Sequence, residues 1–272
     1  MRPVDTATLL QAVQSFQRTW METGGERLDR PWGSIVRNLR FPRIYMANAA
    51  CVDRTPEDGV DIVLEDMDEV FEDTKVRHRN LVFQDAQDAF RQQDFLAGKG
   101  FQPLSDLAMA RLGLPTCITN PDLELREVGP VESVDAHRQL RQALHMAAGY
   151  DAEESEQLLA IEGERARSLN WRPFVAYLRG VPAGTISIWP RGGYALLEDV
   201  FTHPRFRMQG VARTMLFQAS KLALRAGADW TLLITNLLDT PRLMYQTLGF
   251  VPVGEIRSYL SVPASTGGPN LM

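Results

Sequence analysis

Cysteine is scarce in this chain, and its scarcity excludes a disulfide framework. Cys51 and Cys117 are the two cysteines among 272 residues, and they do not form the paired spacing of a metal site. Each is interpreted as a small buried apolar residue. Two isolated thiols are typical of a protein in a reducing cytoplasm, so we expect a cytoplasmic location.

Long apolar runs and blocks of one charge are also missing. No apolar stretch approaches the roughly 20 residues of a transmembrane helix, and the N-terminus lacks the apolar core of a signal peptide. The formal net charge is -5 and no Lys/Arg block occurs, so we expect neither a nucleic-acid nor a membrane partner. A hydrophobic content of 44% and a charged content of 23% are ordinary for a globular protein of one large or two modest domains.

The most informative pattern present is a strand, a turn and a helix in the last third of the chain. Alternating side chains predict a strand at 194–202, and apolar positions on one face predict a helix at 211–226. No Ser, Thr, Asp or Asn is placed to cap this helix; the turn before it offers Gly210, Arg205 and Arg207 instead. Uncapped amides at the positive end of a helix dipole suit a phosphate, and a turn that simply hydrates its amides is the alternative.

Two segments of the chain resemble motifs of a known enzyme family. The run from Leu197 to Ala212 resembles the acetyl-CoA signature of the GCN5-related N-acetyltransferase (GNAT) superfamily, Q/R-x-x-G-x-G/A after a strand and a Pro-containing turn. The run from Asn236 to Phe250 resembles the closing N…A..lY..lGF block of that family, at the expected distance downstream. The chain departs from the first pattern at Ala212, where many members have glycine, and at Met208-Gln209, where a small or basic pair is usual.

The resemblance covers roughly 123–262 and implies a GNAT fold, an α/β fold with a central, mostly antiparallel sheet flanked by helices. We expect a GNAT domain at 119–263, a smaller, degenerate GNAT-like domain at 1–118, and a disordered tail at 264–272. The degenerate domain is inferred from an internal sequence similarity, in which LVFQD…FLAGKGF…LAMARLG in the first half aligns with LLITN…LMYQTLGF…IRSYLSV in the second. A common helix-to-strand turn is the alternative explanation of this similarity.

The first of these two similar stretches differs from the second at the residues that matter for a cofactor. It lacks an R-x-x-G-x-G loop, and Leu96 stands where the second copy has Tyr245. We therefore expect the first half to bind no cofactor and to have a structural or substrate-shaping role.

Periodicity and turn residues predict the remaining elements. In the first half we expect helices at 6–19, 60–74 and 86–97, strands at 43–50, 79–85 and 105–112, and a loop at 22–31. In the second half we expect a linker at 114–121, helices at 131–147, 152–168 and 240–248, and strands at 123–128, 174–178, 182–189, 230–235 and 250–262.

Direct acyl transfer to an amine has simple chemical requirements. The amine must lose a proton, and the leaving thiolate must gain one or be stabilised. Such a transfer needs no nucleophilic side chain and no metal, which fits a sequence without G-x-S-x-G, H-E-x-x-H or C-x-x-C. The resemblance implies acetyl-CoA as co-substrate, and we expect no metal.

The expected function is therefore an acetyl-CoA-dependent N-acyltransferase that acts on a primary amine. A small-molecule acceptor is favoured over a peptide, because the extra half-domain could close one side of the cleft. A CoA-binding regulatory or scaffold protein without turnover is the alternative. The identity of the acceptor and the oligomeric state, including a homodimer, stay open at this stage.

The strand at 194–202 carries two adjacent carboxylates, Glu198 and Asp199, as candidates for the base. Strand alternation predicts that they point to opposite faces, with Glu198 on the face of Leu196, Val200 and Thr202. The resemblance implies a base on this strand, and we favour Glu198, acting directly or through water. A salt-bridged or solvent-facing carboxylate is the alternative.

Tyr245 and Asn236 lie in the closing block of the resemblance. The resemblance implies that the Tyr245 phenol lies near the thioester sulfur as a general acid, whereas a half-buried tyrosine anchored by its ring is the alternative. Asn236 is expected to hydrogen-bond the pantetheine of the cofactor, and a plain turn residue at the end of a strand is the alternative.

The remaining cofactor contacts also follow from the resemblance. It implies that a strand backbone binds the pantetheine arm as an added strand and that the amides of the following loop bind the pyrophosphate. The expected cofactor-binding residues are Val200, Phe201, Thr202, Arg207, Met208, Gln209, Gly210, Val211, Ala212, Arg213 and Asn236. Three histidines, His137, His145 and His203, are interpreted as structural; Trp189 and Tyr194 are assigned to the core or to the acceptor pocket.

Overall fold

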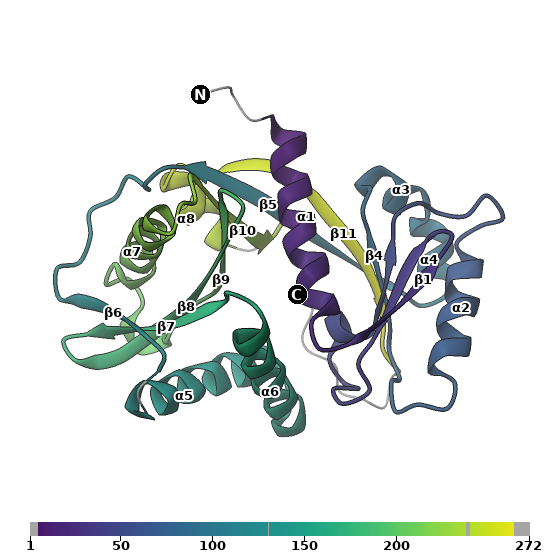
Figure 1. The fold of residues 1–272 in the computed structure, drawn as a ribbon, viewed down its shortest axis with the longest axis horizontal. Helices are drawn as coiled ribbons and strands as arrows, with labels where there is room; N and C mark the ends of the chain where they lie inside the picture. The colour runs from purple at the N-terminus through teal and green to yellow at the C-terminus, as the bar shows by residue number, and fades with distance from the viewer. Residues whose placement is uncertain (1–4, 130, 238–239, 264–272) are drawn as a thin grey trace.

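The computed structural model of the protein contains one continuous sheet of eleven strands and describes residues 5–129, 131–237 and 240–263 (Figure 1). Neighbouring strands follow the order β1-β2-β3-β4-β11-β5-β10-β9-β8-β7-β6. All neighbours in this sheet are antiparallel except β3 with β4 and β10 with β9. The expected mixed, mostly antiparallel α/β architecture is confirmed. The tail expected at 264–272 lies outside the described residues.

The strands are β1 (Glu26–Arg30), β2 (Gly33–Arg37), β3 (Ala49–Val52), β4 (Arg79–Phe83), β5 (Gln102–Leu112), β6 (Leu123–Glu127), β7 (Arg172–Leu178), β8 (Val181–Arg191), β9 (Tyr194–Thr202), β10 (Trp230–Asn236) and β11 (Val251–Ser261). The helices are α1 (Thr6–Glu22), α2 (Asp61–Phe71), α3 (Ala86–Arg91), α4 (Gln93–Gly98), α5 (Val131–Ala147), α6 (Ala152–Ser168), α7 (Val211–Arg225) and α8 (Pro241–Thr247). Short 3₁₀ turns occur at Tyr45–Ala47 and Pro204–Phe206. In the part of the chain that the structure describes, no helix combines the length and the apolar character needed to cross a membrane.

The last strand of each half of the chain is exchanged into the other half. β11 lies between β4 and β5, and its Tyr259 is opposite Leu81. β5 pairs along β10, where Ala110 is opposite Leu232. Figure 1 shows β5 and β11 as long strands that connect the two parts of the molecule. A division of the chain after residue 118 therefore separates two sequences that complete each other's sheet.

The two helix-to-strand turns that suggested an internal repeat have matching backbone hydrogen bonds. In the first half the amide of Phe101 donates to the carbonyl of Leu96 at 3.0 Å, and in the second half Phe250 donates to Tyr245 at 3.1 Å. The glycine before each phenylalanine has a φ of 84°, a conformation that glycine adopts without a steric penalty. The two turns therefore share their local backbone geometry, which fits both an internal repeat and a common helix-to-strand turn.

The three largest apolar clusters of the described residues each join a helix to the sheet. α2 packs on the first half through residues such as Met67, and α7 packs on the second half through residues such as Met215. α1 covers the middle of the sheet, where Phe16 contacts Trp189 edge to face at 4.9 Å between ring centroids. Each fully buried side chain of this size contributes about 1.5–3 kcal/mol. An N-terminal helix thus packs directly beneath the strands of the second half.

The second half agrees closely with expectation, whereas three expectations for the first half are wrong. β9, α5 and α6 have the expected bounds. The expected loop at 22–31 contains the edge strand β1, whose largely polar sequence shows no apolar alternation. The expected strand at 43–50 begins as a 3₁₀ turn, because the Asn48 amide donates to the Phe41 carbonyl and accepts from the Asn38 amide. The expected helix at 86–97 is divided into α3 and α4.

Candidate active site

Strand β9 separates from its neighbour β10 after three residue pairs. The pairing covers Tyr194, Ala195 and Leu196. Beyond Leu196, β9 continues to pair with β8 as far as Thr202, while β10 continues to pair with β5. In the described sheet the edge of β9 that faced β10 therefore has no neighbouring strand from Leu197 onward. Such an edge can bind an extended ligand through backbone hydrogen bonds.

A β-bulge at Asp199 lies on this diverging part of β9. The register with β8 shifts at this point, and Asp199 has a left-handed φ of 56°. A bulge adds one residue to a strand and breaks the alternation of its side chains. Val200 packs in the same apolar cluster as Leu197, while Glu198 and Asp199 both act on the Arg141 guanidinium. The expectations that the two carboxylates point to opposite faces and that Val200 shares the face of Glu198 are therefore wrong.

The Asp199 carboxylate belongs to a buried ion-pair network. Nη2 of Arg141 lies 2.9 Å from Oδ1 of Asp199 and 2.5 Å from Oε1 of Glu162. The Ser187 hydroxyl donates to Oδ2 of Asp199 at 3.0 Å, and the Thr185 hydroxyl donates to its backbone carbonyl at 3.0 Å. Helices α5 and α6 and strand β8 thus all hold the bulge in place.

Glu198 enters the same network without being paired in it. Its Oε2 atom is buried and has no hydrogen-bond partner among the described residues. Burial and then the charge of Asp199 raise the pKa of Glu198 to about 8, against the opposing effects of Arg165, Trp171 and Arg141. A buried carboxyl whose pKa is close to neutral pH is suited to accept a proton in catalysis.

Two histidines flank Arg141 along one face of α5. His137, Arg141 and His145 follow one another at intervals of four residues, a spacing that places side chains on the same face of a helix. Burial and then the positive charge of Arg141 lower the pKa of both imidazoles to about 4. Nδ1 of His145 lies 3.0 Å from the Ser155 hydroxyl. Both rings are therefore neutral at pH 7, and α5 presents one positive charge to Asp199.

The start of α7 has the uncapped geometry expected from the sequence. Gly210 is the N-cap residue with a φ of 74°, no side chain caps the helix, and its first turn contains no acidic residue. The Asn120 amide donates to the carbonyl of Gln209 at 2.9 Å and so supports the loop from outside. Met208 has a left-handed φ of 62° and is fully exposed, and Arg207 is also exposed. Backbone amides, the helix dipole and a nearby guanidinium suit a phosphate group.

Tyr245 and Glu198 lie on opposite faces of the sheet, near the point where β9 and β10 diverge. Its side chain is 6% exposed and packs in the apolar cluster of Leu197, at 6.1 Å from the Phe250 ring centroid. Glu198 instead faces Trp171. The structure therefore brings the two predicted catalytic residues to the same divergence without placing them side by side.

The other predicted residues are distributed around this region. Val200, Phe201 and Thr202 follow the bulge on the edge without a strand partner, and Asn236 ends β10 at an exposed position. His203 acts as a turn residue, because its Nδ1 accepts from the Arg205 amide at 3.3 Å. Val211, Ala212 and Arg213 form the first turn of α7.

The aromatic candidates for the acceptor pocket belong to the core. Trp189 is 2% exposed and lies against Phe16, and Tyr194 packs at the edge of the same cluster. Packing against α1 from the first half therefore accounts for both residues.

Sequence reasoning missed three charged residues of the site: Arg141, Glu162 and Arg165. The guanidinium of Arg165 donates to the Trp20 carbonyl at 2.8 Å and 3.0 Å and is one of the positive charges acting on Glu198. The four-residue spacing of polar side chains along α5 was a signal in the sequence. The partners on α6 had no such signal, because only the packing of α5 against α6 brings them together.

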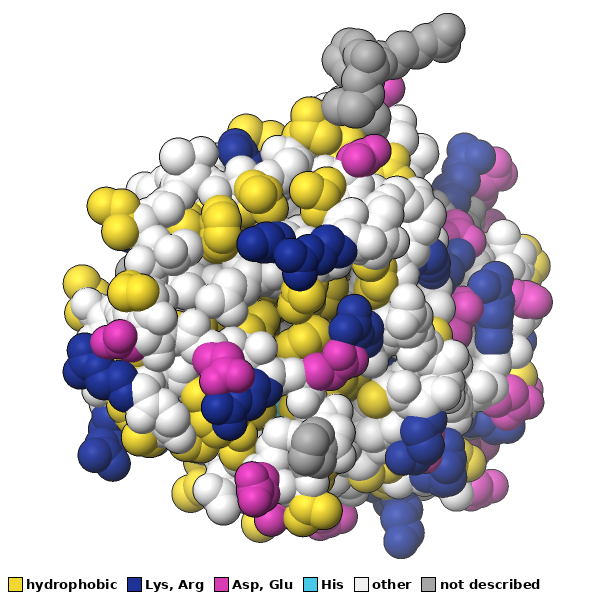
Figure 2. Space-filling model, turned by 60° about the vertical axis from the view of Figure 1, so that its left-hand side comes forward, with side chains coloured by type: hydrophobic (Ala, Val, Ile, Leu, Met, Phe, Trp, Pro, Cys, Tyr) yellow, Lys and Arg dark blue, Asp and Glu magenta, His cyan; other side chains and the backbone are white. Residues whose placement is uncertain are grey.

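Figure 2 shows the face of the molecule that carries α7, α8 and β6. A hollow lies near the middle of this face, with hydrophobic side chains inside it and Lys or Arg side chains along its upper border. A hollow of this kind, apolar inside and basic at its edge, suits a ligand with an apolar arm and anionic groups.

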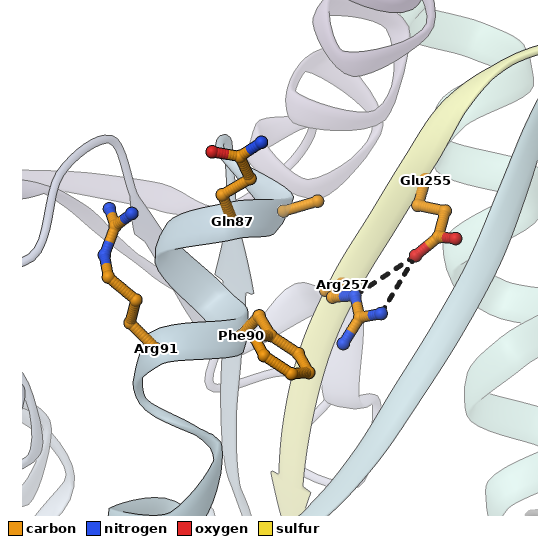
Figure 3. Close-up of a pocket in the computed structure, with 6 residues that line it drawn as sticks. Gln87, Phe90, Arg91, Glu255 and Arg257 are labelled. Atoms are coloured by element: carbon orange, nitrogen blue, oxygen red, sulfur yellow. Dashed lines mark hydrogen bonds and ion pairs between the residues drawn. The ribbon is translucent and has the colours of Figure 1, made fainter.

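Two pockets lie away from β9 and are not part of this site. One, of about 380 Å³, lies between α3 and β11, where the exposed Phe90 ring packs against Arg257 (Figure 3). The other, of about 420 Å³, lies between the first half and the start of α6 and is lined by residues including Arg43, Tyr45 and Arg77. Neither pocket is lined by a residue of β9 or α7.

Comparison with known proteins agrees with this geometry. The family model of the acetyltransferase (GNAT) domain matches residues 170–252, which span β7 to β11 with the bulge and the α7 loop. A search of curated protein sequences found no match. A protein of unknown function from Staphylococcus epidermidis has a similar structure, with a TM-score of 0.69, 15% identity and coverage of 88% of this chain and 94% of that one.

Two further solved structures are named as members of the same superfamily. A GCN5-related N-acetyltransferase from Kribbella flavida has a TM-score of 0.67 and 14% identity, covering 97% of this chain and 98% of that one. A tandem GNAT protein of the clavulanic acid biosynthesis pathway has a TM-score of 0.54 and 15% identity, covering 82% and 76%. The family match thus gives this chain an acetyltransferase (GNAT) domain at residues 170–252, and the solved structures show that its overall fold is similar to that of GNAT proteins.

Proposed function

We propose that this protein is an acetyl-CoA-dependent N-acyltransferase that transfers an acetyl group directly to a primary amine of a small-molecule acceptor. The observation that carries the proposal is the divergence of β9 from β10, which has on one face the Glu198 carboxyl, with a buried oxygen that has no partner among the described residues, and on the other a phenol, Tyr245. The uncapped start of α7 lies directly after the diverging strand. A GNAT domain supports acyl transfer in general, and these features support the more specific reaction.

The described residues fit acetyl-CoA, which supplies the acetyl group as a thioester. The amides at the start of α7 would bind the pyrophosphate, with Arg207 and Arg213 exposed beside them. The free edge of β9 at Val200–Thr202 would hydrogen-bond the pantetheine arm as an added strand. Asn236, at the end of β10, would contact the same arm from the other side of the divergence.

Glu198 and Tyr245 would carry the two proton transfers of the reaction. The acceptor nitrogen forms its bond to the acetyl carbon and gives a proton to Glu198 as the bond from that carbon to sulfur breaks. Tyr245 gives a proton to the departing sulfur and is reprotonated from solvent, to which Glu198 returns its own proton. Each transfer of this kind contributes about 100-fold or more to the rate.

The proposed base has a defined pH dependence. Glu198 accepts a proton only when it is ionised, and its pKa is raised to about 8. We therefore expect kcat/KM to increase with pH up to about pH 8 and then to level off, provided that the acceptor amine itself does not limit the rate.

Turnover and binding measured together test the proposal. Acetyl-CoA binding is followed by calorimetry, and thiol release is followed with a panel of small amines and amine-bearing peptides. We expect binding, turnover with at least one small amine, and a loss of kcat of about 100-fold in Glu198→Gln with little change in acetyl-CoA affinity.

The other outcomes are equally informative. Binding of acetyl-CoA without turnover on any amine would favour a CoA-binding regulatory or scaffold protein. Turnover on peptides alone would contradict a small-molecule acceptor. The free thiols of Cys51 and Cys117 are compatible with the cytoplasm, where we propose that the protein acts.

A further inference from the structure

The buried network places two carboxyls next to each other and provides hydrogen bonds to both oxygens of only one of them. Asp199 accepts hydrogen bonds from Arg141 at 2.9 Å and from Ser187 at 3.0 Å. Oε2 of Glu198 is equally buried but accepts no hydrogen bond from the described residues. The bulge that makes this arrangement possible holds Asp199 at a φ of 56°, which is a strained backbone for most residues and tolerable for Asp or Asn.

Charged groups face Glu198 from every element packed against it. Asp199 is its neighbour on β9, Arg141 faces it from α5, and Arg165 faces it from α6. Glu162, also on α6, binds the same Nη2 atom of Arg141 as Asp199 does, but it is not among the main influences on Glu198. The neutral imidazoles of α5 add no charge at pH 7.

Building on the proposed function, we propose that Asp199 is a positioning residue for the base. Arg141 and Ser187 fix its carboxylate beside Glu198, and the negative charge of Asp199 makes Glu198 the stronger proton acceptor of the two. Glu198 remains the residue that receives the proton from the acceptor nitrogen; Asp199 acts only through it.

The physical reason is the repulsion between two carboxylates that share one buried site. When one of them is held in its charged form by donors, the other binds a proton more readily, because ionising it would bring two negative charges together. Donors reach Asp199 and not Oε2 of Glu198, so the proton belongs on Glu198. Without the Arg141 contact, this difference in hydrogen bonding between Asp199 and Glu198 would be smaller.

Site-resolved titration tests the proposal without relying on turnover. Carboxyl carbons of glutamate are labelled with ¹³C and titrated by NMR, and the Glu198 signal is assigned by its loss in Glu198→Gln. We expect Asp199→Asn, which keeps shape and tolerates the left-handed backbone, to lower the Glu198 titration midpoint by about one pH unit or more. The acidic limb of the kcat/KM profile should move in the same direction.

Glu162→Gln is the matched control, because it removes the same charge from the other carboxylate bound to Nη2 of Arg141, which is not among the main influences on Glu198. We expect this variant to leave the Glu198 midpoint nearly unchanged. An unchanged midpoint in Asp199→Asn, or an equal shift in Glu162→Gln, would overturn the proposal. If Asp199→Asn does not fold, Asp199→Ser is a second neutral replacement that must give the same downward shift.

The test also separates this inference from the proposed function. A protein that acetylates no amine but shows the expected shift would refute the function and retain the coupling between Asp199 and Glu198. An active enzyme whose Glu198 midpoint is insensitive to Asp199 would retain the function and refute the coupling.

Discussion

Each half of the chain contains a strand-turn-helix unit, and the two units differ in the pairing of the strand and in the charge at the start of the helix. In the second half β9 diverges from β10, and α7 begins at Gly210 with no acidic residue in its first turn. In the first half β3 stays paired with β4 to its last residue, and α2 begins with Asp61. A side chain added to Gly59 would meet the Asp61 carboxylate at 2.3 Å, so this carboxylate lies over the turn.

This difference teaches that the fold alone does not make the cofactor site. Both halves supply a parallel strand pair and a helix beginning after a glycine-containing turn. Of these two described strand-turn-helix units, the one in the second half combines a strand that diverges from its parallel neighbour with a helix start open to an anion. A carboxylate in the first helical turn already occupies the favourable end of the dipole and repels phosphate. The first half is therefore expected to bind no acetyl-CoA.

The largest effect is expected from separating the halves. Fragment 1–118 would lack β11 beside β4, and fragment 119–272 would lack β5 beside β10, so each would expose a long apolar strand edge. We expect neither fragment to show the cooperative thermal unfolding of the full chain by circular dichroism. A 119–272 fragment that unfolds cooperatively and binds acetyl-CoA would contradict this expectation and establish the second half as an independent domain.

The next effect concerns the two matched helix-to-strand turns. We expect Tyr245→Phe to lower kcat by about 100-fold with little change in acetyl-CoA affinity, because only the acidic hydroxyl is removed. Leu96→Met in the equivalent turn is the control and should leave kcat unchanged. If Tyr245→Phe loses both folding and binding, the tyrosine is structural. An unchanged kcat with acetyl-CoA saturating and chemistry rate-limiting would show that the phenol is not the acid.

A smaller effect is expected from transferring the acidic residue of the first half to the second. Ala212 of α7 corresponds to Asp61 of α2 in the order Gly-Val-x that opens both helices. We expect Ala212→Asp to weaken acetyl-CoA binding about tenfold or more, measured by calorimetry. Asp61→Ala should leave both the affinity and a stoichiometry of one per chain unchanged. A second binding site in that control would show that the first half is blocked by this charge alone.

The smallest effect compares the buried histidines of the two halves. Burial lowers the pKa of His78 in the first half to about 4, as it does for His137 and His145 in the second. An unfolded chain binds protons at these sites below about pH 6.5, whereas the folded chain does not until about pH 4. The contribution of these histidines to stability should therefore be greatest above pH 6.5 and decrease as the pH falls toward 4.

A variant at His78 isolates the contribution of the first half to the pH dependence of stability. His78→Gln keeps an amide donor for the Asn48 carbonyl, which lies 3.1 Å from Nε2 of His78, and removes the titration. Between pH 7 and pH 4.5 we expect its Tm to decrease by a few degrees less than that of the wild type. Equal decreases in the two proteins would assign the pH dependence to the second half.

The elements that the sequence predicted well are those with a strong apolar rhythm. β9, α5 and α6 were expected with the bounds that the structure shows, because each has a buried face with regular spacing. β1 was missed because an exposed edge strand of alternating charges has no apolar face to detect. The exchange of β5 and β11 had no local signal, because the sequence of a strand does not specify which other strand it pairs with.

The sequence by itself determined the resemblance to GNAT motifs, the position of the α7 loop and the choice of Glu198 and Tyr245 as candidates, because these depend on residue types at short spacings. Tertiary structure alone decided the bulge at Asp199 and the buried pairing of Arg141 with Asp199 and Glu162. Those contacts join β9 to helices more than 30 residues away in the chain. Their energies arise from burial and from distances between charges, and no pattern along the sequence encodes either one.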